Sequence, residues 1–328
     1  MNYRELGKTG MEVSEVSLGT WQVGGKWGEE FDRDNAEKII NLAIDNGVNF
    51  IDTADVYSDG ESEAAIGRVL KTRTEKVYVA SKCGRKISPH MSEVYTPKRL
   101  KDLVESSLRN MQMEQLDLIQ LHCPPTQVYY RPEIFEVFDR LKDEGKIAHF
   151  GVSVEKIEEA LKAMEYPNVA SVQIIFNMFR QRPLDKFLRQ ASAEKIGVIA
   201  RVPLASGLLT GKFDKQTRFS DTDHRSFNRE GQAFDKGETF AGIDYDTGLE
   251  AVEEIKKVFP QMYTLPQYAL RWILMFQEVN TVIPGASSPE QVLSNVKASD
   301  IPPLTSEEMH QVDAIYKSKI KEHVHQLW

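Results

Sequence analysis

The sequence predicts an α/β protein that forms one closed (β/α)8 (TIM) barrel, with a β-hairpin before it and a long insertion after its seventh strand. Short β-rich segments alternate with amphipathic helical segments along most of the chain. The first seven of these β-rich segments start 23 to 39 residues apart, which is the length of one strand-helix unit. Eight such units close into a barrel, and 328 residues fit one barrel domain. We therefore expect a single domain over residues 1–328.

The opening segment YRELGKTGMEVSEV predicts the hairpin. Its two halves are rich in strand-forming residues and meet at Lys8-Thr9-Gly10, where a glycine suits a tight turn. The strand-helix repeat begins only after this segment, so the hairpin is expected to add to the barrel.

Eight further segments are interpreted as the barrel strands. Most are apolar on both faces, as parallel strands covered by helices should be. They are VSLGT (16–20), VNFID (48–52), VYVASK (77–82), LDLIQLH (116–122), IAHFGVS (147–153), ASVQII (170–175), GVIARV (197–202) and VNTVIP (279–284).

Helices are expected between these strands. In TPKRLKDLVESSLRNM, Thr96 is a good N-cap, a proline suits the first helical position, and the leucines and valine fall on one face. RPEIFEVFDRLKDEGK repeats this scheme and stops at Gly145. DRDNAEKIINLAIDNGV is expected to begin at Asp34 and to end at Asn46-Gly47.

Residues 211–246 are interpreted as an insertion between the seventh and eighth strands. This segment is polar, contains several glycines and is weakly periodic. A loop of this length in a compact domain is usually functional or disordered. An open doubly wound sheet is the alternative fold, but no GxGxxG motif follows the first strand to support it.

Composition and charge argue against several classes of function. The formal net charge is −8 and Lys and Arg are not clustered, so neither nucleic acid nor an anionic membrane is an expected partner. No apolar stretch is long enough to span a bilayer, and MNYRELGKTG lacks the apolar core of a signal peptide. Only Cys83 and Cys123 are present, outside any CxxC motif, which favours a cytoplasmic location. No metal site is expected, because no ligand spacing links His149, His224, His310, His323 and His325.

Polar side chains gather at the C-terminal ends of the predicted strands, where such a barrel carries its chemistry. Asp52, Lys82 and His122 end three successive strands, and Tyr57 starts the loop after the first of them. A free phenol has a pKa of about 10, and a neighbouring ammonium would lower that pKa. Lys82, held by Asp52, is expected to do this. Tyr57 would then exchange a proton with a carbonyl or alcohol oxygen that His122 orients.

Each of these four residues has a structural explanation when taken alone. Asp52 can cap a turn, Lys82 can be an exposed strand-end lysine, His122 can be a structural histidine, and Tyr57 can be a half-buried loop residue. Their coincidence at one barrel mouth favours a site. The two cysteines are expected to point away from it and to pack under helices, because side chains alternate along a strand.

With these motifs in place, the chain resembles the bacterial-type aldo-keto reductases. The resemblance runs from YRELGKTGMEVSEVSLGTW to VIPGASSPEQVLSN, nearly the whole chain. The Asp-Tyr-Lys-His tetrad of that family matches Asp52, Tyr57, Lys82 and His122. The resemblance implies an NAD(P)H-dependent oxidoreductase that reduces aldehydes or ketones to alcohols, with hydride from the nicotinamide and Tyr57 as general acid. The implied partner is a small carbonyl compound, and no protein partner is indicated.

The resemblance also implies how the cofactor is held, with residues 211–246 covering it. The carboxamide would be bound after the fifth and sixth strands, the pyrophosphate by RVPLASGLLTGK, and the adenosine by the last strand and helix, whose N–H groups suit an anion. The implied substrate pocket contains Trp21, Tyr57 and His122, and Trp27 stays open between pocket and packing roles. The implied cofactor contacts are Gly19, Thr20, Trp21, Asp52, Ser153, Gln173, Arg201, Pro203, Leu204, Ser206, Gly207, Lys212, Gly285, Ser287, Gln291 and Asn295.

Three positions depart from the family pattern. Val154 stands where an asparagine usually binds the carboxamide, and Arg201 stands where many members stack a tyrosine on the nicotinamide. A guanidinium there would disfavour the positively charged oxidised cofactor. PGASSPEQ lacks the usual cation for the 2′-phosphate, which Lys212, Arg218 or Arg225 would have to replace. NADP(H) remains the expected cofactor, with NAD(H) possible.

Two other classes of function are weighed against the reductase. A cofactor-binding regulatory or redox-sensing barrel with little turnover stays open, because some members of this superfamily are channel-associated β subunits and because Val154 and Arg201 are altered. A cofactor-free hydrolase or isomerase is disfavoured, since paired catalytic carboxylates and a nucleophile motif are absent. The substrate, the oligomeric state and the role of the final segment KEHVHQLW do not follow from the sequence.

Overall fold

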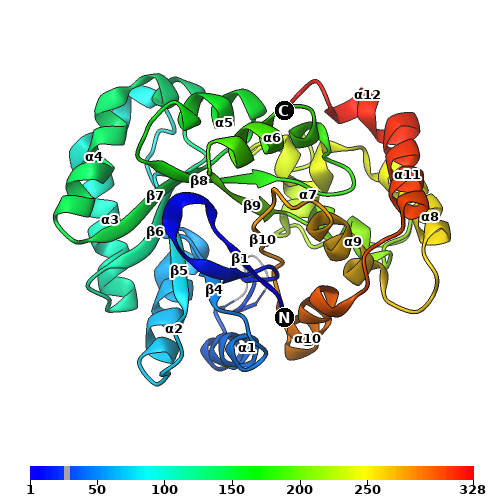
Figure 1. Cartoon of the computed structure of the whole chain (residues 1–328), viewed down its shortest axis with the longest axis horizontal. Helices are drawn as coiled ribbons and strands as arrows, with labels where there is room; N and C mark the ends of the chain where they lie inside the picture. The colour runs from blue at the N-terminus through cyan, green and yellow to red at the C-terminus, as the bar shows by residue number, and fades with distance from the viewer. Residues whose placement is uncertain (26–29) are drawn as a thin grey trace.

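The computed structural model describes residues 1–25 and 30–328, and it confirms the predicted closed barrel (Figure 1). The barrel strands, in order around the ring, are β3 (Leu18–Gly19), β4 (Phe50–Asp52), β5 (Tyr78–Cys83), β6 (Leu116–His122), β7 (Ile147–Ser153), β8 (Val169–Ile175), β9 (Gly197–Arg201) and β10 (Thr281–Val282). All neighbouring pairs are parallel. Each strand overlaps the segment that the sequence predicts for it. Trp27 lies outside the described residues.

The first and last strands meet, which closes the sheet. Parallel bridges join Val16 to Val282 and Gly19 to Gly285. Glycine is required at position 19, because a Cβ there would lie 2.8 Å from the carbonyl oxygen of Ile283. The ring therefore leaves no unpaired edge between β3 and β10.

The predicted hairpin covers the N-terminal end of the barrel. Strands β1 (Tyr3–Glu5) and β2 (Glu12–Ser14) pair antiparallel, and Gly10 takes a left-handed conformation in the turn. In Figure 1 this hairpin crosses the centre of the ring. Its apolar side chains join those inside the barrel in one buried cluster of Leu6, Met11, Val13, Phe50, Tyr78, Ala80, Leu118, Ile199 and Ile283. Since these side chains fill the N-terminal end, a site is expected at the C-terminal ends of the strands.

Helices surround the strands and bury their apolar faces against them. They are α1 (Arg33–Asp45), α2 (Glu61–Leu70), α3 (Pro97–Met111), α4 (Pro132–Asp143), α5 (Ile157–Met164), α6 (Phe187–Ala193), α7 (His224–Phe227), α8 (Tyr245–Val258), α9 (Leu265–Leu274), α10 (Pro289–Val296), α11 (Ser306–Ile315) and α12 (Lys321–Val324). Among the described helices, none has the length and apolar character needed to cross a membrane.

The predicted helix boundaries hold with one correction. Thr96 caps α3 as predicted, accepting a hydrogen bond from the Arg99 N–H, and Gly145 follows α4 with a positive φ. Helix α1, however, does not begin at Asp34. Asp32 is its N-cap, because the Asp32 carboxylate accepts from the Asn35 N–H at 3.0 Å.

The insertion after β9 is ordered, and the C-terminal residue Trp328 packs against it. It contains α7 and several short 3-10 turns. Trp328 is buried against it: the indole Nε1 donates to Asp235 at 2.7 Å, and the Arg180 guanidinium lies 4.0 Å from the ring centroid. A Cβ on Gly242 would lie 2.5 Å from the Trp328 ring, so glycine is needed there. Trp328 therefore supports the insertion from outside the strand ring.

Candidate active site

Strand register brings the predicted site residues to one level of the barrel. Gly19 lies opposite Asp52, His122 opposite Ser153, and Ser153 opposite Gln173. Because parallel strands end at the same edge, these side chains share the C-terminal mouth. The ring therefore assembles the candidate site from separate strand ends.

Lys82 is fixed by three acceptors. Its ammonium donates to Asp52 Oδ1 at 2.5 Å, to the Thr53 carbonyl oxygen at 2.8 Å and to the Tyr57 hydroxyl at 3.2 Å. An ammonium has three donors, so every one is used. Burial lowers the pKa of Lys82, but Asp52 and Tyr57 outweigh burial and raise it overall, which keeps the ammonium charged. The predicted Asp-Lys-Tyr arrangement is therefore present.

The expectation that Lys82 would give Tyr57 a lowered pKa is wrong for this structure. Burial raises the pKa of Tyr57 and outweighs the lowering effect of Lys82. Tyr57 begins a tight turn in which Ser58 and Asp59 both take positive φ, and this turn brings the phenol against buried groups. The phenol consequently keeps its proton through the neutral range, which suits a proton donor.

His122 faces Tyr57 from the next strand but one. The two rings meet edge to face with centroids 6.0 Å apart. Burial, followed by the charges of Arg85 and Lys82, holds the pKa of His122 well below its usual range, so the imidazole is neutral. Its Nε2 lies 3.4 Å from Arg85 Nη1, and its buried Nδ1 has no hydrogen-bond partner among the described residues.

Two buried amides hold the second oxygen of Asp52. Gln173 donates to Asp52 Oδ2 at 2.7 Å and Gln120 donates to it at 3.2 Å. The sequence assigns Gln173 to a carboxamide, and here it also orients the carboxylate. Gln120, deep inside the barrel, was missed because its neighbours in sequence are apolar.

Trp21, which the sequence places in the substrate pocket, lies beside Tyr57 and His224. Its ring stacks on Tyr57 at 6.4 Å between centroids and lies 5.0 Å from the ring of His224. His224 belongs to α7 in the insertion, so the insertion reaches the barrel mouth beside Trp21. Burial lowers the pKa of His224 to about 4, which leaves it neutral against the indole.

The expected cofactor positions form a continuous track along neighbouring strand ends. Ser153 and Arg201 end β7 and β9, Gln173 lies two residues before the end of β8, and the segments after β9 and β10 continue from them. Between 202 and 207 several residues take positive φ, so the backbone turns sharply in the segment that is expected to bind the pyrophosphate. A side chain added at Gly285 would meet no atom closer than 3.6 Å, which leaves room for a ligand. The donor set and the space fit an elongated dinucleotide.

Cations lie beside only part of this track. Arg225 Nη1 is 3.5 Å from the position that a Cβ on Gly207 would take, and Asp223 holds this guanidinium at 2.6 Å. Lys212 and Arg218 are exposed. Arg225 is thus the best placed of the three candidate phosphate cations.

The two altered positions have different environments. The Val154 side chain is fully buried in the core, and only its main chain reaches the site, where its carbonyl oxygen accepts from Arg201 at 3.1 Å. Arg201 donates to Glu155 at 2.8 Å and lies 3.7 Å from Glu238. Its charge is therefore compensated within the protein.

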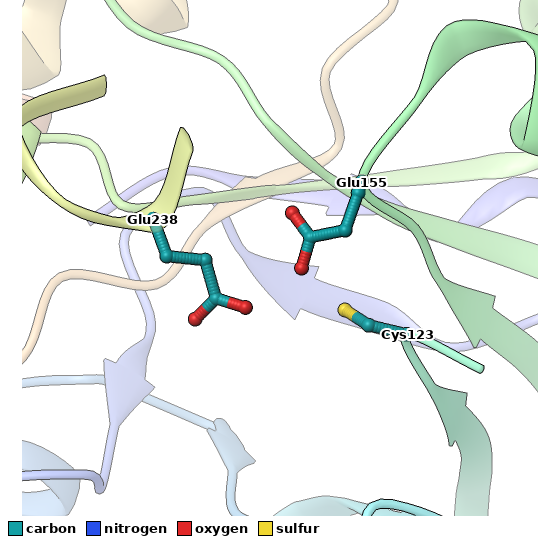
Figure 2. A group of neighbouring side chains, drawn as sticks. All are labelled: Cys123, Glu155 and Glu238. Atoms are coloured by element: carbon teal, nitrogen blue, oxygen red, sulfur yellow. The ribbon is translucent and has the colours of Figure 1, made fainter. Parts of the chain in front are cut away.

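A cluster of charged groups at the mouth was missed by the sequence analysis. Glu155 follows β7 and Glu238 belongs to the insertion, and their side chains point toward each other and toward Cys123 (Figure 2). Burial raises the pKa of Glu155 well above its usual range; burial also opposes ionisation of Glu238, but Arg85 and Arg201 outweigh it and lower the pKa of Glu238. Two guanidinium groups already bind these carboxylates, which disfavours a metal ion between them.

The prediction for the cysteines is right for Cys83 and wrong for Cys123. Cys83 lies in the core beneath the helices. Cys123 takes a φ of 45° directly after β6, so the alternation of the strand no longer applies, and its sulfur lies 3.5 Å from Arg201 Nη2. Burial raises the pKa of both thiols, so neither is a ready thiolate.

Asp55 is a second buried group that the sequence analysis missed. Neither of its carboxylate oxygens has a well-formed hydrogen-bond partner among the described residues, and burial, followed by Glu63, raises its pKa to about 7. A raised folded pKa means that the folded state binds the proton more tightly, so stability falls as pH rises from about 4 to about 7.

We expect Asp55→Asn to remove this pH-dependent loss of stability. The amide resembles the protonated acid, so the variant should match the wild type near pH 4 and exceed it by about 2–4 kcal/mol at pH 8. Urea unfolding at both pH values measures the difference. Asp59→Asn, an exposed aspartate paired with Lys86, is the control and should bring no such gain. An advantage of Asp55→Asn that does not grow with pH would contradict the assignment.

Comparison with known proteins identifies the family of this site. The chain matches the model of the aldo/keto reductase family over residues 15–317. It is 30% identical to the aldo-keto reductase YhdN of Bacillus subtilis over 99% of this chain and 96% of that protein. Among solved structures it is similar to a glycerol dehydrogenase of Gluconobacter oxydans (TM-score 0.79, 31% identity, 99% and 96% coverage). It is also similar to an aldo-keto reductase of Bacillus halodurans in its holo form (TM-score 0.78, 26% identity, 99% of both chains).

Proposed function

Because the chain belongs to the aldo/keto reductase family and is an NAD(P)H-dependent oxidoreductase, we propose that it reduces small aldehydes or ketones to alcohols with NADP(H) as the preferred cofactor. The observation that carries this proposal is the hydrogen bond of Lys82 to the Tyr57 hydroxyl at 3.2 Å, with His122 facing the same phenol. These groups enclose the position of one substrate oxygen.

The residues of this chain divide the work of the reaction. Tyr57 donates its proton to the carbonyl oxygen, and the neighbouring Lys82 ammonium stabilises the phenolate that remains. Asp52, held by Gln120 and Gln173, keeps Lys82 in position. Neutral His122 binds the substrate oxygen, and Trp21 covers the substrate. Bound reduced nicotinamide supplies the hydride for the carbonyl carbon.

The preference for NADP(H) rests on the family, in which NADP is the typical cofactor. The segment PGASSPEQ lacks the usual cation for the 2′-phosphate, so Lys212, Arg218 or Arg225 of the insertion would have to supply one. Arg225 lies beside Gly207 on the segment expected to bind the pyrophosphate, which both cofactors share, so its place there does not by itself favour NADP(H). NAD(H) is expected to bind more weakly.

Titration with NADPH and NADH separately, followed by addition of 4-nitrobenzaldehyde, tests the proposal. Tight NADPH binding with steady oxidation of the cofactor supports the reductase. Since the Gluconobacter relative is named a glycerol dehydrogenase, alcohol oxidation with NADP⁺ is measured alongside. Binding without turnover in either direction would overturn the enzyme proposal and favour a cofactor-binding regulatory barrel.

We expect Arg201→Tyr to shift cofactor preference toward the oxidised form. An aromatic ring replaces a cation beside the nicotinamide, so the ratio of the Kd for NADP⁺ to that for NADPH should fall by a few-fold. The change is modest because Glu155 already compensates the Arg201 charge. Fluorescence titration of both forms measures the ratio, and Arg201→Lys, which keeps the charge, is the control. An unchanged ratio in Arg201→Tyr counts against the effect.

A further inference from the structure

The barrel mouth contains a built carboxylate-binding site. Arg85 Nη2 donates to Glu238 Oε1 at 2.7 Å, and Arg201 Nη1 lies 3.7 Å from the other oxygen of the same carboxylate. Glu238 is buried, with 8% of its side chain exposed, and so is Arg201. Guanidinium groups bind carboxylates through their planar donors, and two of them converge here on one carboxylate.

This site adjoins the atoms that face the substrate. Arg85 Nη1 lies 3.4 Å from Nε2 of His122, which faces the Tyr57 ring. A carboxylate bound to Arg85 is therefore within the length of one small organic molecule of the oxygen that Tyr57 protonates. Arg85 follows β5, which pairs with β6, the strand that ends in His122. Its contact with His122 places it beside the expected position of the substrate oxygen.

Arg85 is the less tightly paired of the two guanidinium groups. Arg201 binds Glu155 at 2.8 Å and also lies 3.7 Å from Glu238, whereas Arg85 binds Glu238 at 2.7 Å and lies 3.9 Å from the nearest Glu155 oxygen. Arg85 is also the more exposed, with 24% of its side chain accessible against 9% for Arg201. A carboxylate that replaced Glu238 would therefore pair with Arg85.

The main chain at Glu238 is held by Ser206, whose hydroxyl donates to the Glu238 carbonyl oxygen at 2.9 Å and accepts from the Phe240 N–H at 3.1 Å. The side chain comes from a short 3-10 turn of the insertion rather than from a strand. We therefore expect displacement of Glu238 from Arg85 to involve rotation of its side chain rather than movement of its main chain.

From this geometry we propose that the substrate is a carbonyl compound bearing a carboxylate, and that this carboxylate takes the place of Glu238 on Arg85. The inference rests on the proposed reductase function and adds the substrate class. When substrate is absent, the Glu238 carboxylate binds Arg85 in its place. The reaction is unchanged: the carbonyl gains the hydride and the Tyr57 proton, while the carboxylate stays intact.

A matched pair of substrates tests the proposal by activity. 4-Carboxybenzaldehyde carries a charged carboxylate opposite its aldehyde, and its methyl ester lacks that charge. 3-Carboxybenzaldehyde and its methyl ester form a second pair, in which the distance between aldehyde and carboxylate is shorter. Loss of a hydrogen bond between charged groups costs about 1.5–3 kcal/mol, or about 10- to 100-fold. In the wild-type protein kcat/KM should favour the acid over the ester by at least about tenfold. Arg85→Gln should abolish this preference.

The control is the neighbouring cation in the same loop. Lys86 pairs with the exposed Asp59 at 2.8 Å and points away from the mouth. Lys86→Gln should keep the acid-to-ester ratio of the wild type. Glu238→Gln removes the resident carboxylate, so it should increase the ratio further by lowering KM for the acid.

Binding of benzoate gives a readout that does not need turnover. In calorimetric titrations without cofactor, the Kd for benzoate should rise at least about tenfold in Arg85→Gln and fall in Glu238→Gln. An ester reduced as well as the acid by the wild-type protein, with benzoate Kd unchanged in Arg85→Gln, overturns the substrate class and leaves the reductase intact. If neither aldehyde is reduced but benzoate still binds through Arg85, the anion site stands and the reductase function fails.

Discussion

Replacing Tyr57 with phenylalanine is expected to lower kcat for aldehyde reduction by about 10²- to 10⁴-fold, the usual contribution of a positioned general acid. The phenol is the one group of the Asp52-Lys82-Tyr57 arrangement that presents an exchangeable proton to the mouth, since all three protons of Lys82 are used. The ring remains in Tyr57→Phe, so stacking on Trp21 and cofactor binding should persist. Steady-state turnover and NADPH titration measure the two effects separately.

Tyr130→Phe is the matched control for this substitution. Tyr130 is an exposed phenol, and losing its hydroxyl should leave kcat within about twofold, as for a surface change away from any special contact. A Tyr57→Phe enzyme that retains more than about a tenth of wild-type kcat would show that another group donates the proton.

The raised pKa of Tyr57 sets the pH dependence expected of the wild-type enzyme. Burial keeps the phenol protonated through neutral pH, so the rate of reduction should be flat there and fall only in alkaline solution, where the proton is lost. Alcohol oxidation needs the deprotonated phenol and should therefore rise with pH over the same range. Rate profiles in both directions, measured with saturating cofactor, distinguish this behaviour from that of a phenol with a lowered pKa.

Strand periodicity made much of the fold and the tetrad predictable. Parallel strands that are apolar on both faces stand out from amphipathic helices, and a polar residue that ends such a strand has few places to go except the barrel mouth. Asp52, Lys82 and His122 are of this kind, and strand register alone brings their neighbours to the same level. The prediction thus relied on short-range pattern and on a shared geometry of strand ends.

The remaining parts of the site depend on contacts that no local pattern encodes. Arg85 and Glu238 are 153 residues apart, and Glu238 comes from an insertion whose path is set by tertiary packing against Trp328 and the barrel. The position of Cys123 was predicted wrongly because its own positive φ turns its side chain toward the site, against the alternation of the strand. Of these residues, only Arg85 could have been found from the sequence, because it is a cation three residues after Lys82 at the end of a predicted strand.

The second large effect is expected from Lys82→Met. Lys82 and Asp52 are 1% and 2% exposed, and removing one partner of such a buried ion pair leaves an uncompensated charge that costs about 3–5 kcal/mol. Gln120 and Gln173 still donate to Asp52 but carry no charge. Urea unfolding at pH 7 should show this loss, and turnover should fall at least about 10²-fold because the phenolate loses its ammonium.

A double variant separates the two consequences. In Asp52→Asn combined with Lys82→Met no charge remains buried, so most of the lost stability should return, whereas turnover should stay as low as in the single variant. A Lys82→Met protein as stable as the wild type at pH 7 would contradict the buried pair. A double variant with restored turnover would instead show that the reaction does not need the ammonium and that the single variant fails through its unpaired Asp52 charge. The double variant is therefore expected to recover stability but not turnover. The fold requires only that the buried charges balance, whereas the reaction requires the ammonium of Lys82.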